Sequence, residues 1–286
     1  MSDNQKGLSA DQHTIAEHRW KTTDGHHNLY VQEWGNRDGK SVLFLHGGPG
    51  SGCHDGQKQL FDPKKHYVIF LDQRGCGHST PANSLIENST QRLIEDIEMI
   101  TQKLSLDSFT IFGRSWGSTL GLCYAIRKPR QVTSLVIGGV FLGTREEIDW
   151  VDTGKFSTFF PEIGEYANTS NPSTKDYAQM AVATMRLDDR YPIIDANEWS
   201  NETSKIERSY LDSECYLPAN YLLKNAHKIA CPVVIVQGRY DMMTPPKFAY
   251  ELHKKLPDST IQWTVAGHSS SDRANFDVSK AILSQL

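Results

Sequence analysis

A serine at position 115 is the residue of this sequence best placed to act as a nucleophile. It lies within residues 113–117, Gly-Arg-Ser-Trp-Gly, which match the GxSxG pattern of a sharp turn between a strand and a helix. An apolar run at Phe109–Phe112 precedes this motif directly, and a helical segment at Ser118–Arg127 follows it directly. In so tight a turn a Cβ at either glycine would clash, and the serine hydroxyl stands clear of the sheet edge. The pattern therefore predicts Ser115 as a catalytic nucleophile.

A serine hydroxyl needs a neighbouring base to become nucleophilic at neutral pH. In the fold that carries this turn, the chain order is Ser, then Asp or Glu, then His. Asp241 follows the apolar run Val233–Val236, and His268 follows the run Ile261–Val265. Each comes just after the carboxyl end of an expected strand, at the edge where Ser115 is expected. We therefore predict His268 as the general base and Asp241 as the carboxylate that orients it.

A glycine-rich loop at residues 46–50, His-Gly-Gly-Pro-Gly, follows the apolar run Val42–Leu45. Acyl transfer builds negative charge on the substrate carbonyl oxygen, which two backbone N–H groups can stabilise. In this fold one donor follows the nucleophile, here Trp116, and the other comes from this early loop. The second donor is Gly48 or Gly47, and the sequence does not choose between them. His46 is interpreted as a residue that shapes the loop and transfers no proton.

Two further groups of polar residues are interpreted as structural. Residues 72–79, Asp-Gln-Arg-Gly-Cys-Gly-His-Ser, follow the apolar run Tyr67–Leu71 and predict a turn, which an ion pair between Asp72 and Arg74 is expected to brace. Four early histidines come before the first expected strand and are interpreted as surface residues. They are His13, His18, His26 and His27.

The elements expected to position these residues are strands and helices in alternation. Several apolar runs are β-branched and nearly continuous, as strands buried on both faces must be. Helical patterns lie between some of them, at 91–104, 118–127 and 246–256. Alternation of this kind implies a mostly parallel sheet with helices on both faces, and with the motifs above it predicts an α/β-hydrolase fold. The expected strands are Val42–Leu45, Tyr67–Leu71, Phe109–Phe112, Ser134–Ile137, Val233–Val236 and Ile261–Val265.

The alternation stops between residues 143 and 224, where strand signals vanish and aromatic and acidic residues dominate. We interpret this stretch as a helical cap inserted between two strands. The predicted division is therefore 1–142 and 225–286 for the two parts of the hydrolase core, with 143–224 as the cap. An insertion there would lie over the carboxyl edge of the sheet, where ligands bind in open α/β folds.

The composition is that of an ordinary globular protein, with 38% hydrophobic and 22% charged residues among 286. The formal net charge of -4 offers no basic surplus for nucleic acid. The polar N-terminus predicts no secretory signal, and no apolar run is long enough to cross a membrane. Five scattered cysteines without a CxxC pair favour neither a disulfide framework nor a metal site. We expect a cytoplasmic protein with no metal or cofactor; its oligomeric state is left open.

Taken together, these motifs resemble those of the proline iminopeptidases, also called prolyl aminopeptidases. The similarity runs roughly through Tyr30–Val140 and Leu222–His268, and the combination is much narrower than GxSxG alone. It implies release of N-terminal proline from peptides through an acyl-enzyme, without metal or cofactor, by Ser115, Asp241 and His268. The matching segments are HGGPG at 46–50, DQRGCG at 72–77, SWGS at 115–118, GRYD at 238–241 and GH at 267–268.

The same resemblance bears on substrate recognition. Caps of this family carry glutamates that pair with the substrate's α-ammonium group, and Ile206–Leu211 is similar to the segment containing one of them. The resemblance thus implies that Glu207 binds substrate, since a carboxylate near the triad would select a cationic amine. One position departs from the family, which usually has glycine where this chain has Arg114. A cation there is expected to lie near the pocket and to repel an ammonium group.

Two other functions compete with the aminopeptidase. A carboxylesterase or lactonase would use the same triad under a different cap, and it would not require a free amine. A non-catalytic binding protein on a hydrolase fold would not react with a serine-directed probe. Either a small peptide or another small molecule would serve as substrate.

Overall fold

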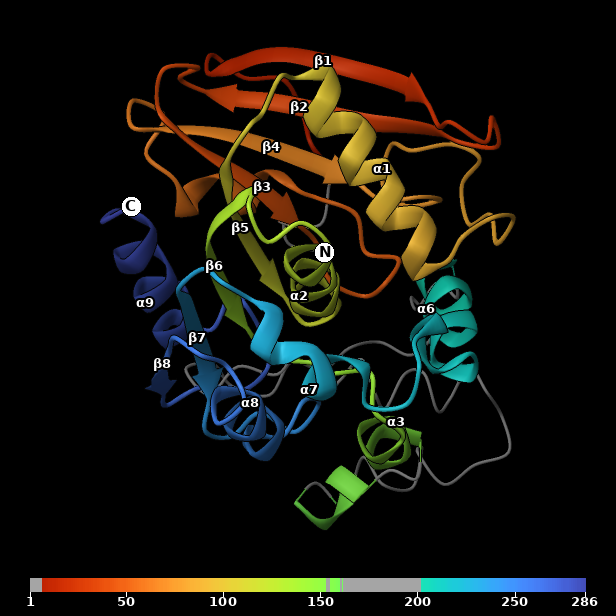
Figure 1. Ribbon diagram of the computed structural model, residues 1–286, viewed down its shortest axis with the longest axis vertical. Helices are drawn as coiled ribbons and strands as arrows, with labels where there is room; N and C mark the ends of the chain where they lie inside the picture. Colours follow the sequence, from red (N-terminus) through yellow and green to blue (C-terminus); the bar gives the residue numbers. More distant parts are fainter. Residues whose placement is uncertain (1–6, 153–154, 160, 162–201) are drawn as a thin grey trace.

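A sheet of eight described strands forms the centre of the protein (Figure 1). The computed structural model describes residues 7–152, 155–159, 161 and 202–286. The strand order is β1-β2-β4-β3-β5-β6-β7-β8, and the pairs from β4 to β8 are all parallel. The mostly parallel sheet that the sequence predicts is therefore confirmed. The strands are β1 (Thr14–Lys21), β2 (Asn28–Gly35), β3 (Lys40–Leu45), β4 (His66–Asp72), β5 (Phe109–Arg114), β6 (Val132–Gly138), β7 (Val233–Gly238) and β8 (Ser259–Thr264).

The first two strands, β1 and β2, are absent from the sequence prediction, which begins the sheet at Val42. They pair antiparallel with each other, and β2 pairs antiparallel with β4. Polar side chains such as the buried Glu33 interrupt their apolar pattern. The interpretation of His27 as a surface residue is wrong, because it is buried with its Nε2 2.7 Å from the carbonyl oxygen of Ile86. Burial is possible there because this hydrogen bond satisfies a ring nitrogen.

Helices cover both faces of the sheet, and each face has its own apolar cluster. On one face lie α1 (Thr90–Lys103), α2 (Trp116–Arg127) and α8 (Pro246–His253). Their buried side chains, among them Ile97, Leu120 and Leu252, join one cluster with the sheet. On the other face lie α9 (Arg273–Leu283) and the short 3-10 helix η2 (Asp55–Leu60), where Leu283 joins Phe44 and Phe70. Helices on both faces confirm the predicted fold class.

The chain between β6 and β7 contains helices and, among its described residues, no strand. Residues 162–201 of the expected cap lie outside the described residues, so the three-part division stays a prediction. In Figure 1, α6 lies on the side toward which the arrows of β3 and β4 point. The described elements are α3 (Arg145–Asp152), η3 (Lys155–Thr158), α6 (Glu202–Asp212), η4 (Glu214–Tyr216), α7 (Tyr221–Asn225) and η5 (Ala226–Lys228).

Candidate active site

The turn between β5 and α2 holds Ser115 in a conformation that side chains rarely adopt, with φ 53° and ψ −127°. Its backbone N–H donates a hydrogen bond of 2.9 Å to the carbonyl oxygen of Gly138. The two glycines of the motif are required by close packing. A Cβ at Gly113 would overlap the carbonyl oxygen of Gly117, and a Cβ at Gly117 would overlap that of Leu45. Backbone packing thus fixes the strained turn and the direction of the serine.

Asp241 and His268 lie side by side beyond the ends of β7 and β8. The His268 Nδ1 lies 2.9 Å from Oδ2 and 3.1 Å from Oδ1 of Asp241. Since a carboxylate only accepts hydrogen bonds, Nδ1 carries the ring proton and Nε2 is left as the basic nitrogen. The Asp241 side chain is fully buried. Burial opposes its ionisation, but attraction to His268 and hydrogen bonds from His268 and Thr244 outweigh it, so the pKa of Asp241 is lowered.

Two residues that hold Asp241 were missed by the sequence analysis. The Thr244 backbone N–H donates to Asp241 Oδ1 at 2.8 Å, and its hydroxyl donates to Oδ2 at 2.9 Å. The Gln237 side-chain amide donates to Oδ2 at 3.1 Å. The available signal in the sequence was a glutamine at the end of an otherwise apolar strand. In the structure Gln237 is fully buried, and a buried amide needs hydrogen-bond partners.

The loops from β6 and β8 bring the histidine ring to the nucleophile's edge of the sheet. Gly139 has a positive φ of 51°, and a Cβ there would lie 3.0 Å from the Cε1 atom of His268. The ring therefore packs on Gly139, directly after the residue whose carbonyl accepts the hydrogen bond from Ser115. Ser115, Asp241 and His268 come from distant parts of the sequence, and the carboxyl ends of β5, β7 and β8 place them at one edge of the parallel sheet.

The glycine-rich loop after β3 lies against the nucleophile. A Cβ at Gly47 would lie 3.4 Å from the Cβ and 4.0 Å from the Oγ of Ser115. Gly48 has φ +104°, and a Cβ there would overlap the backbone nitrogen of Gly50. Trp116 is the first residue of α2, where helix N–H groups have no partner within the helix. Backbone of Gly47 and the N–H of Trp116 thus flank the serine from two sides.

A hydrogen-bonded network joins this loop to two other motifs of the sequence. The backbone N–H of Gln73 donates to His46 Nε2 at 3.0 Å, and its side-chain amide donates to the His46 carbonyl oxygen at 3.0 Å. The Trp116 indole N–H donates to Gln73 Oε1 at 2.8 Å. Because Nε2 of His46 accepts, its proton is on Nδ1, and burial lowers the pKa of this histidine. His46 is therefore neutral and structural.

We expect Gln73→Leu to lower kcat/KM about tenfold and to destabilise the fold by about 1–3 kcal/mol. The substitution leaves the Trp116 indole N–H and the His46 carbonyl oxygen buried without partners. Steady-state kinetics and urea unfolding measure the two effects. Gln102→Leu, the same change on an exposed position of α1, is the control and should alter neither beyond twofold or about 0.5 kcal/mol. Equal behaviour of the two variants would show that the network does not support the site.

The expected ion pair between Asp72 and Arg74 does not form, and that prediction is wrong. Asp72 accepts hydrogen bonds from the backbone N–H groups of Cys53 at 2.6 Å and His78 at 2.7 Å. The buried Arg74 instead donates two hydrogen bonds to Asp96 of α1, at 2.6 and 2.7 Å. Each charge finds partners in a different segment because the turn directs the two side chains apart. Long-range partners of this kind are not visible in local sequence.

Arg114 packs against the loop that carries His268. Its Nη2 donates to the backbone carbonyl oxygen of His268 at 3.3 Å, and its Nη1 occupies the space that a side chain at position 138 would fill. The guanidinium is thus packed among the strand ends, behind the His268 loop. The side chain is partly buried and donates to backbone; the expected repulsion of an ammonium group stays a prediction.

Glu207 lies on α6, which packs against the nucleophile's turn. The buried Tyr210 ring contacts the Trp116 ring edge-on, with centroids 4.8 Å apart. The Tyr210 hydroxyl donates to Asn88 Oδ1 at 2.9 Å. Glu207 is half-buried and lies one helical turn before Tyr210, on a neighbouring position of the helix surface. The structure thus brings the segment containing Glu207 to the residue that follows Ser115.

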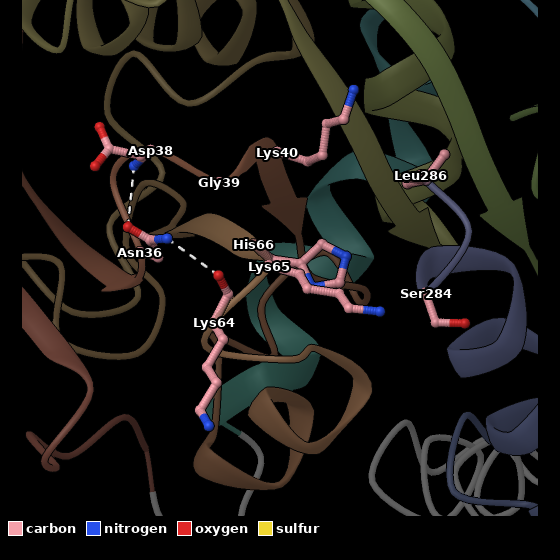
Figure 2. Close-up of a pocket in the computed structure, with 9 residues that line it drawn as sticks. All are labelled: Asn36, Asp38, Gly39, Lys40, Lys64, Lys65, His66, Ser284 and Leu286. Atoms are coloured by element: carbon pink, nitrogen blue, oxygen red, sulfur yellow. Dashed lines mark hydrogen bonds between the residues drawn. The ribbon is translucent and has the colours of Figure 1, made fainter.

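A cavity of about 550 Å³ lies at the opposite edge of the sheet (Figure 2). Lys40 and His66, the first residues of β3 and β4, line it together with the C-terminal Leu286. Asn36 donates to the carbonyl oxygen of Lys64 beside it at 3.0 Å. Because Ser115 and His268 lie beyond the carboxyl ends of the strands, this cavity is separate from the candidate active site.

Two other features, a metal site and a membrane span, are absent from the described residues. Within the ranges given above, no group of three or more His, Cys, Asp or Glu residues could hold a metal ion. Across the same part of the chain, no helix is both long and apolar enough for a bilayer span.

Several known proteins with similar sequences are named proline iminopeptidase. Residues 40–272 match the family model described as alpha/beta hydrolase fold. The chain is 35% identical to a proline iminopeptidase of Xylella fastidiosa strain 9a5c, over 92% of this chain and 94% of that protein. It is 33% identical to a proline iminopeptidase of Arabidopsis thaliana, over 86% and 73%. An esterase from Exiguobacterium antarcticum shares the fold, with a TM-score of 0.68 and 20% identity over 94% of this chain and 99% of that one.

Proposed function

The chain belongs to the proline iminopeptidase family of α/β-hydrolases, and we propose that its catalytic triad is Ser115, His268 and Asp241. It is a serine aminopeptidase that removes N-terminal proline from small peptides. The observation that carries the triad is the buried Asp241 carboxylate on His268 Nδ1, at the sheet edge where the strained turn presents Ser115. That arrangement leaves Nε2 of His268 as the base for the serine hydroxyl.

The reaction follows from these positions. His268 Nε2 takes the proton of Ser115 Oγ as the oxygen attacks the carbonyl carbon of the N-terminal residue. The carbonyl oxygen becomes an oxyanion, which the N–H groups of Trp116 and of Gly47 stabilise, with Gly48 as the alternative loop donor. The C–N bond then breaks, His268 gives the proton to the leaving amine, and a water molecule hydrolyses the acyl-enzyme by the same route.

The free amine of the substrate is the feature that an aminopeptidase must recognise. Glu207 is our candidate for its counter-charge, because α6 contacts the nucleophile's turn through Tyr210 and Trp116. A carboxylate shielded from water there would pair with the ammonium group through a charge-assisted hydrogen bond. Esters and lactones without an amine would gain nothing from it.

A panel of chromogenic substrates tests the proposed function. We expect turnover of prolyl p-nitroanilide, slower turnover of alanyl p-nitroanilide, and a loss of at least about 30-fold on N-acetylation, which removes the charge of a partly buried pair. A nitrophenyl ester of a short acyl chain completes the panel. Comparable rates for the acetylated and free prolyl anilides, beside fast ester hydrolysis, would favour the carboxylesterase or lactonase.

The binding-protein alternative is tested separately. A fluorophosphonate probe should label the folded protein at Ser115, because its reaction needs an activated serine. Failure to label would favour a non-catalytic protein. The cytoplasmic location stays a prediction from the sequence.

A further inference from the structure

A partly buried guanidinium lies beside the proposed triad. Arg114 is the last residue of β5 and immediately precedes Ser115. Its Nη2 donates to the carbonyl oxygen of His268 at 3.3 Å, whereas its Nη1 is buried without a hydrogen-bond partner among the described residues. An unpaired buried polar group is costly, and the absence of a side chain at Gly138 makes the room for it. Because this arrangement costs folding free energy, we expect Arg114 to have a function.

The charges around the guanidinium point to that role. Asp241 and Asp272, both buried, attract it from two sides. Asp241 holds the His268 ring at Nδ1, and Asp272 accepts the backbone N–H of Gly267 at 3.1 Å. Burial lowers the pKa of Arg114 to about 10, with the two carboxylates opposing the shift, so it remains a cation at neutral pH. The cation therefore donates to the His268 backbone and attracts two of the carboxylates that hold the His268 loop.

We propose that Arg114 is a positioning residue that fixes the His268 loop and whose positive charge opposes protonation of the His268 imidazole. This inference rests on the proposed function, because it takes His268 as the base. The hydrogen bond to the His268 carbonyl fixes the backbone, and the charge acts on the ring.

The direction of the pH effect follows from the charges that face the ring. Asp241 from the end of β7 and Asp272 before α9 both favour the imidazolium, whereas Arg114 from the end of β5 opposes it. The uncharged Thr244 hydroxyl, 3.2 Å from Nδ1, completes these neighbours. Only the neutral imidazole can act as base. Removal of the Arg114 charge should therefore move the acidic limb of the rate profile to higher pH.

The first test compares Arg114→Met with Arg114→Lys across pH 5 to 9. Methionine keeps the apolar bulk of the side chain and removes its charge. We therefore expect the midpoint of the acidic limb of the kcat/KM profile to move about 0.5–1 pH unit higher. The rate at the low-pH end should then fall about three- to tenfold, with KM within twofold. Lysine keeps the charge and should restore most of the wild-type profile. A folded Met variant whose limb stays in place, with rates within twofold, would overturn the proposal.

Two readouts keep this inference separate from the substrate assignment. Hydrolysis of prolyl anilide depends on His268 as the base and on recognition of the substrate amine. The rate of fluorophosphonate labelling depends on His268 alone, because the probe carries no amine. Labelling that shifts with Arg114→Met while prolyl anilide is never cleaved supports the inference and rejects the substrate. Cleavage of prolyl anilide with an unshifted labelling profile supports the proline substrate and rejects the proposed role of Arg114. If the Met variant fails to fold, Arg114→Gly, which also removes the charge, replaces it with the same expected shift.

Discussion

Replacement of Ser115 by alanine should reduce kcat/KM for prolyl anilide by at least about 1000-fold. Without the hydroxyl no acyl-enzyme can form, and the remaining rate reflects binding and oxyanion stabilisation alone. His268→Ala should cost a similar factor, because a triad acts as a unit and its losses do not add. Asp241→Asn should leave more activity than either, because the amide keeps the shape of the side chain. It should still lower kcat/KM, since an amide does not hold His268 in the same tautomer.

The control for this prediction is Ser108→Ala, an exposed serine just before β5. It should retain wild-type activity, and circular dichroism should show all variants folded. The Ser115 variant should also fail to react with the fluorophosphonate probe. More than about 1% of the wild-type rate in a folded Ser115→Ala protein, assayed free of contaminating hydrolase, is incompatible with this nucleophile.

The positions of the three proposed triad residues could be predicted because they depend on strand order and strand ends. A buried parallel strand shows itself as a continuous apolar run, and its carboxyl end is where a following polar residue meets the catalytic edge. Asp241 follows such a run in β7, whereas His268 follows β8, an edge strand that alternates intermediate and exposed positions. The partners of these residues could not be predicted in the same way. Gln237 and Thr244 contact Asp241 through geometry that only the folded loop defines.

The unpredicted part of the fold has a comparable cause. Strands β1 and β2 lie at the antiparallel edge of the sheet, where polar side chains are tolerated and the apolar run is broken. Glu33 on β2 is buried, yet it accepts hydrogen bonds from the Tyr67 hydroxyl and the Arg37 guanidinium. A glutamate satisfied by distant partners looks, in sequence alone, like a solvent-exposed residue.

Arg114 shows that a sequence motif does not fix the direction of a neighbouring side chain. The sequence places a cation beside the nucleophile, and proximity suggests conflict with an ammonium group. In the structure the guanidinium turns toward Gly138 and the His268 carbonyl, between two buried carboxylates. Its charge is compensated locally by Asp241 and Asp272. Glu207 on α6 stays our candidate for recognition of the substrate amine.

Replacement of Glu207 by glutamine should lower kcat/KM for prolyl anilide by at least about 30-fold. The amide keeps the shape of the side chain and removes its charge, so the loss measures the pairing with the substrate ammonium group. Truncating one partner of a partly desolvated charge pair costs about 2–5 kcal/mol. The effect should be specific to the amine: hydrolysis of a short nitrophenyl acyl ester, which has no ammonium group, should change less than about twofold.

The matched control is Asp212→Asn, which removes one negative charge from the exposed end of the same helix. That carboxylate pairs with Arg208 at 2.5 Å, a surface pair whose loss should cost at most about 1 kcal/mol of stability and leave both substrates unaffected. A selective loss with Glu207→Gln and none with Asp212→Asn would assign Glu207 to the amine. Equally small changes in anilide and ester rates would instead make Glu207 a surface residue, and would move the preferred function from aminopeptidase to esterase.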